Sequence, residues 1–85
     1  METINWYEIW MDDKESILNT MIKNLAADLA AGYNYFGECI NRQRETIDNY
    51  KREFDSQIMS FADMTEGKRN RWCYYDLLRR GAITR

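Results

Sequence analysis

The sequence predicts an all-α protein, built either as a three-helix bundle or as a long helical hairpin followed by a C-terminal helix. A short helical N-terminal segment is expected to precede these elements. The 85-residue chain has no proline and only four glycines, so few residues interrupt its helices. Its apolar residues recur at spacings of three and four, which is the period of one helix face. With 45% hydrophobic and 14% aromatic residues, the chain is too apolar to be disordered, and its length fits one domain.

The first helix is expected over residues 13–31. Apolar residues between Ile17 and Leu29 repeat at helical spacing, and "NLAADLAAG" continues them with strong helix formers. Asp12 followed three residues later by Glu15 matches a capping box, which predicts where this helix begins. The preceding "INWYEIW" is either a separate short helix or the beginning of the first one.

The segment "GYNYFG", from Gly32 to Gly37, predicts a helix end and a tight turn. A continuous helix through it is the alternative, at a cost of about 1 kcal/mol per glycine. The second helix is expected over residues 37–62, because its apolar residues resume at alternating steps of three and four. A third helix is expected over 65–80.

The expected third helix has recognisable ends. Asp63 and Glu66 have capping-box spacing, and Thr65 is a rival N-cap. Gly81 follows the last predicted turn, at the position where glycine adopts the left-handed conformation without strain.

Composition excludes several classes of protein. No run of residues approaches the roughly 20 apolar residues of a membrane span, and the N-terminus does not resemble a signal peptide, so we expect a cytoplasmic protein with no membrane partner. Cys39 and Cys73 lack metal-ligand spacing, and we expect both to be reduced thiols in the core rather than a disulfide.

Enzymatic chemistry is not expected. The chain has no histidine, the commonest general base and metal ligand. Neither cysteine has a neighbour in the sequence that would activate it as a nucleophile. The carboxylate pairs Asp12/Asp13 and Glu53/Asp55 are too close in sequence to face each other on a helix. We therefore expect no catalytic residue, no metal and no cofactor.

Charge is distributed unevenly along the chain. Residues 1–63 carry six basic and twelve acidic side chains, a net charge of −6, whereas residues 64–85 carry six basic and two acidic, a net charge of +4. Such asymmetry is typical of a basic segment that binds nucleic acid. Attraction between the two halves of one fold explains it equally well.

The stretch "GKRNRWCYYDLLRRG", residues 67–81, is the strongest candidate for a binding site. On a helix at 100° per residue, we expect one side to be core and the other to combine cations with aromatic rings. The expected core side comprises Cys73, Tyr74, Leu77 and Leu78. The predicted partner-binding residues are Lys68, Arg71, Trp72, Tyr75 and Arg79.

Three interpretations of these five residues remain open. Arginine, tryptophan and tyrosine dominate the hot spots of protein interfaces, which favours a protein partner with Trp72 as the anchor. Arginine also binds phosphate and aromatic rings stack on bases, which would suit a small DNA-binding regulator. Alternatively, Trp72 and Tyr75 pack under the N-terminal "WYEIW" segment and serve the core. The surplus of aromatic residues also makes a structural dimerisation module possible, with an antiparallel homodimer through the long helices.

The tail "RWCYYDLLRRGAIT" resembles the ends of small accessory proteins of bacteriophages and mobile elements. The resemblance covers about fifteen residues and includes no catalytic or ligand motif. Such accessory proteins include inhibitors of host defence of the anti-CRISPR type, which commonly bind a host effector without chemistry. The resemblance therefore implies a non-enzymatic inhibitor that binds a nucleic-acid-handling host protein, and it assigns no residues.

Overall fold

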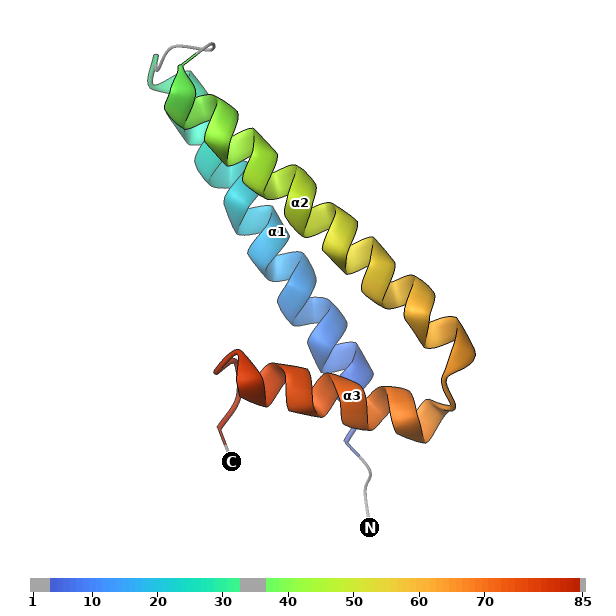
Figure 1. Cartoon of the computed structure of the whole chain (residues 1–85). Coiled ribbons are helices and arrows are strands. Elements are labelled where there is room, and N and C mark those ends of the chain that lie inside the picture. The colour runs from blue at the N-terminus through green and yellow to red at the C-terminus, as the bar shows by residue number, and fades with distance from the viewer. Residues whose placement is uncertain (1–3, 33–36, 85) are drawn as a thin grey trace.

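The computed structural model describes residues 4–32 and 37–84, which form three α-helices and one turn of 3-10 helix (Figure 1). Helix α1 spans Trp6–Ala30, α2 spans Glu38–Ser60, η1 spans Phe61–Asp63 and α3 spans Glu66–Arg79. Helices α1 and α2 lie side by side as a hairpin, and α3 crosses one end of it (Figure 1). The all-α prediction is confirmed in its second form, a long hairpin followed by a C-terminal helix.

The predicted break between the first two helices is confirmed. The predicted beginning of the first helix at residue 13 is wrong, whereas the alternative in which "INWYEIW" contains its beginning is confirmed. Helix α1 ends at Ala30, and Gly32 has φ +90°, the left-handed conformation expected of a helix C-terminus. The rest of the predicted turn, residues 33–36, lies outside the described residues. At its other end α1 begins at Trp6, so "WYEIW" is its first part and Asp12 lies within it.

Two asparagines explain why α1 begins earlier than its sequence suggests. Asn5 Oδ1 accepts a hydrogen bond from Glu8 N at 3.1 Å, as an N-cap does. Asn70 Oδ1, which comes from α3, accepts from Trp6 N at 2.6 Å and from Tyr7 N at 3.3 Å. Two amide groups at the start of α1 are thus satisfied by a side chain more than sixty residues away.

The ends of α3 agree with the sequence. Thr65 is the N-cap, since its Oγ1 accepts a hydrogen bond from Lys68 N at 3.2 Å. Of the two predicted caps, Thr65 is therefore the correct one, and Asp63 belongs to η1. At the C-terminus Gly81 has φ +75°, with hydrogen bonds from Gly81 N to Leu78 O and from Ala82 N to Leu77 O. These two bonds define a Schellman motif.

The core lies where the three helices meet. Trp10 and Phe54 face each other there, and Phe61, Cys73 and Leu77 complete the buried cluster. The ring of Trp10 makes edge-on contacts with Phe54 at 5.6 Å and with Phe61 at 5.2 Å between centroids, a favourable geometry for aromatic pairs.

The hairpin extends well beyond this core. We call the end that α3 crosses the proximal end, and the remainder, α1 from Ile17 onward with α2 up to Ile47, the distal arm. The principal extents of 53 × 25 × 17 Å reflect this arm, which is only two helices wide (Figure 1). Among the helices that the structure describes, none has an apolar run sufficient to span a bilayer.

Candidate binding face on the C-terminal helix

Helix α3 is held to the hairpin by one side and leaves the other open. Cys73, Asp76 and Leu77 are its buried residues, and they share one face because Asp76 and Leu77 follow Cys73 by three and four positions. Burial in apolar surroundings raises the pKa of the Cys73 thiol to about 11, so this thiol is protonated and unreactive at neutral pH. Cys39 by contrast is exposed, and the prediction that it is a core thiol is wrong.

A buried acidic residue anchors α3 to α1. Asp76 is 4% exposed, and its Oδ2 accepts from Trp10 Nε1 at 2.9 Å and from Arg80 Nε at 2.9 Å. Arg79 donates to the other carboxylate oxygen. Burial alone would raise the pKa of Asp76, but the hydrogen bonds from Arg79, Trp10 and Arg80 outweigh it and lower the pKa, so the carboxylate is charged.

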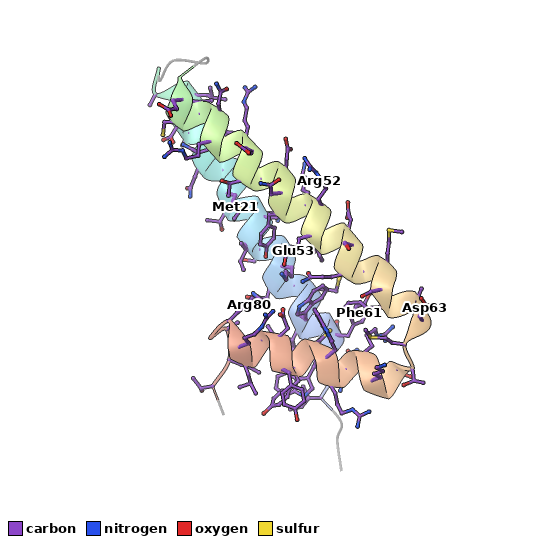
Figure 2. All side chains as sticks on the ribbon, viewed as in Figure 1. Met21, Arg52, Glu53, Phe61, Asp63 and Arg80 are labelled. Carbon is purple, nitrogen blue, oxygen red and sulfur yellow. The ribbon has the colours of Figure 1, made fainter. Side chains whose placement is uncertain are left out.

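Arg80 extends this anchor to a second carboxylate. The side chain reaches from the C-terminal end of α3 toward α1 (Figure 2), where Nη1 donates to Asp13 Oδ2 at 2.8 Å. The Arg80 side chain is mostly buried in this position. An arginine that donates to two carboxylates from two helices fixes the direction in which α3 crosses α1.

Lys14 is the second buried charge at the proximal end, at 3% exposure. Its Nζ lies 5.6 Å from the ring centroid of Trp10 and 5.0 Å from that of Tyr50, within range of cation–π attraction. Burial, together with the positive charge of Arg80, lowers the pKa of Lys14. The proximal end therefore buries charges of both signs between its aromatic rings.

Four of the five predicted site residues lie together on the open side of α3. Tyr75 is 59% exposed, and Lys68, Arg71 and Arg79 are also exposed. The ring of Tyr75 contacts Tyr74 edge-on at 5.3 Å. We call Lys68, Arg71, Tyr75 and Arg79 the outer face.

Trp72 is the exception, and its predicted place on the exposed side is wrong. Its half-buried ring packs against the core, 5.8 Å from Trp10 and 5.2 Å from Phe61 between centroids. The reason is the buried Asp76, which moves the centre of the core side of α3 toward Trp72. The interpretation that Trp72 packs under the N-terminal aromatic segment is therefore confirmed, whereas Tyr75 does not pack there.

Three further residues, not predicted from the sequence, position the outer face. Asp76 and Asn70 join α3 to α1 as described above, and Arg69 lies over the ring of Tyr7 at 4.0 Å. A signal for Asp76 does exist in the sequence. It shares a helix face with Leu77 and is followed three and four residues later by arginines, the spacing of helical ion pairs.

Comparisons with protein-family models, curated proteins and solved structures find no match to this chain. Within residues 4–32 and 37–84, no group of three or more acidic or cysteine side chains is arranged to hold a metal ion. The resemblance of the C-terminal tail to phage accessory proteins thus remains an expectation from sequence.

Proposed function

We propose that the protein acts by stoichiometric binding of another protein through the outer face of α3. The observation that carries this proposal is Tyr75, a large ring 59% exposed between cations on a helix whose opposite side is anchored. Tyrosine and arginine are among the side chains that dominate interface energetics, and the anchored helix presents them without a backbone rearrangement on binding.

Charge favours an acidic protein surface over nucleic acid as the partner. Arg79 is already paired with Asp76, so its charge is partly neutralised within the chain. Among the described residues, Lys68 and Arg71 form no ion pair, which leaves two unpaired cations on the outer face. DNA binding at physiological salt generally needs more phosphate contacts than two. The resemblance to phage accessory proteins adds a class of partner, a host protein that handles nucleic acid, bound without chemistry.

Two substitutions test the outer face, each with a matched control. Arg71→Glu reverses a charge on the outer face, and Arg52→Glu reverses an exposed charge on α2 (Figure 2). Tyr75→Ala removes an exposed ring, and Met59→Ala removes an exposed apolar chain from α2. All four variants should fold like the wild type by circular dichroism.

The binding experiment is affinity capture from a bacterial host, followed by titration calorimetry with the captured protein. The expected result is a one-to-one complex that Arg71→Glu and Tyr75→Ala weaken at least tenfold, while the two controls bind like the wild type. Equal binding by all variants would place the interface elsewhere and end the proposal.

Whether the outer face binds nucleic acid instead is tested by fluorescence anisotropy with labelled single- and double-stranded DNA at two salt concentrations. The protein-partner proposal expects no binding at physiological salt. Binding that falls steeply with salt and is lost in Arg71→Glu would instead make nucleic acid the ligand.

A further inference from the structure

The outer face forms one row of side chains along α3. Its four residues follow one another at spacings of three, four and four, which makes them a ridge of the kind that packs against a second helix. From the first to the last, the ridge covers about 16 Å of the helix axis at 1.5 Å per residue. All four side chains are exposed, since α3 crosses the end of the hairpin and packs against α1 by its other side (Figure 1).

A row of contacting rings supports the centre of this ridge. The ring of Tyr75 contacts that of Tyr74 at 5.3 Å between centroids, and Tyr74 in turn contacts Trp6 of α1 at 4.8 Å. Trp6 itself packs against the core. Tyr75 is therefore 59% exposed and at the same time supported by rings that lead back to the core. A tyrosine in such a place is a typical anchor of a protein interface.

The side of α3 that carries the ridge has positive charge and no carboxylate. Helix α3 has two acidic residues. Asp76 is buried, and Glu66 lies about 180° around the helix from Tyr75 at 100° per residue. On α1, Glu8 lies about 160° around the helix from Trp6, so it too is turned away from the row of rings. The outer face therefore combines an exposed ring with cations only, and its complement is apolar and acidic.

We propose that the outer face takes an acidic amphipathic helix of the partner protein. This inference rests on the proposed function, since it names the element by which the partner binds. Apolar side chains of that helix pack against Tyr75, and its carboxylates pair with Arg71 and Arg79, one turn to either side. Complementary charge of this kind speeds association and fixes the register of the complex.

The spacing of the two arginines specifies the spacing of the carboxylates. Arg71 precedes Tyr75 by four residues and Arg79 follows it by four, so the two arginines lie about 12 Å apart along α3. On a helix that runs nearly parallel or antiparallel to α3, carboxylates at the same separation are seven or eight residues apart. Arg79 can take part although it donates to Asp76, because its side chain is 74% exposed and a guanidinium has five N–H donors.

A helix fits this surface better than an extended segment. Residues 4–32 and 37–84 contain no strand, so they offer no sheet edge to which an extended peptide could add. The outer face has instead the three-and-four spacing by which helices interdigitate. Helix α3 already uses that spacing on its other side, where Cys73, Asp76 and Leu77 are buried.

The test is selection of random eighteen-residue peptides, displayed on phage, against the immobilised protein. The enriched peptides should carry more acidic than basic residues, apolar residues at helical spacing, and two carboxylates seven or eight positions apart. When synthesised and titrated, they should gain helical circular dichroism on binding. Tyr75→Ala and Arg71→Glu should weaken that binding at least tenfold, whereas the exposed controls Met59→Ala and Arg52→Glu should bind like the wild type.

Several results would overturn the proposal. They are the absence of any enriched peptide, enriched peptides that are neutral or basic, enriched peptides without helical spacing, and equal binding by Tyr75→Ala and the wild type. Sedimentation with phosphatidylserine vesicles that is lost in Tyr75→Ala would make a lipid surface the ligand of the outer face, and would also overturn it.

Failure of this inference can be distinguished from failure of the proposed function. A captured protein that needs Tyr75 but is not displaced by the selected peptides would retain the proposed function and reject the acidic helix. A captured protein that binds Tyr75→Ala and Arg71→Glu like the wild type would reject the proposed function, whatever peptides are selected.

Discussion

The proximal end and the distal arm of the same hairpin are stabilised differently. At the proximal end, three helices enclose Trp10, and the charges of Lys14 and Asp76 are buried beside it. In the distal arm, Ile40 and Ile47 are the buried residues among those the structure describes, and α1 meets α2 without a third element. In a chain this short, one complete core and one thin arm indicate that the arm depends on local contacts or on another molecule.

The comparison predicts, first, that the largest loss of stability comes from the centre of the proximal end. Trp10→Ala removes a fully buried ring that contacts four other aromatic residues, and should lower the free energy of unfolding by about 4 kcal/mol. Denaturation by urea, followed by circular dichroism, measures this. Trp6→Ala, which removes a half-buried ring from the same helix, should cost less than half as much. Similar losses would mean that Trp10 is not the centre of the core.

The buried carboxylate should give the next largest effect. Asp76→Ala leaves Trp10 Nε1 without its acceptor and removes a partner of Arg80, which should cost about 3 kcal/mol. Because folding lowers the pKa of Asp76, its contribution is complete above the pKa of an unfolded aspartate, about 3.9, and is lost as the pH falls through the folded value.

Wild-type stability should therefore fall below about pH 4 more steeply than that of Asp76→Ala. Urea denaturation across pH 2.5–7 compares the two, with the exposed Asp12→Ala as the control. If the two proteins lost stability in parallel, the carboxylate of Asp76 would not be the group that titrates.

Local sequence signals predicted this fold well. Apolar periodicity and the scarcity of breakers indicated three helices, and Gly32 and Gly81 end helices because each occupies the left-handed conformation. Thr65 was recognisable as a cap because the bond from its hydroxyl to the backbone is local. Each of these features depends on residues within one turn of each other, which is the range over which sequence patterns carry information.

The errors arose where distant residues decide the local outcome. The capping box at Asp12 is not used, because Asn5 caps α1 seven residues earlier and Asn70, from α3, accepts hydrogen bonds from the first amides of the helix. Trp72 was placed on the wrong side of its helix because an aspartate, Asp76, occupies the middle of the core side. Four of the five predicted binding residues are exposed on the outer face, because exposure follows from helix periodicity once the core side is known.

The distal arm should open more easily than the proximal end. Ile40→Ala removes a buried residue of the arm and should cost about 2 kcal/mol, less than Trp10→Ala, because the surroundings of a two-helix arm relax more readily. Amide hydrogen exchange should be faster around Ile40 than around Leu77 even in the parent protein. Uniform protection along the hairpin would remove the distinction between its two parts.

The smallest effect is expected from the buried lysine. Lys14 has a lowered pKa, so the folded state disfavours its charge, while the rings of Trp10 and Tyr50 and nearby carboxylates offset part of this cost. Lys14→Met keeps the length and packing of the side chain without its charge, and should change the free energy of unfolding by less than about 1 kcal/mol, in either direction.

The pH dependence distinguishes the two charges at the proximal end. Since the unfolded chain binds a proton at Lys14 up to higher pH than the folded one, wild-type stability relative to Lys14→Met should rise as the pH increases toward 10.5. The exposed Lys23→Met is the control, and its stability should run parallel to that of the wild type. If Lys14→Met instead cost as much as Asp76→Ala, the lysine and the carboxylate would act as one network, and the proximal end would owe its stability to paired charges as much as to the burial of Trp10.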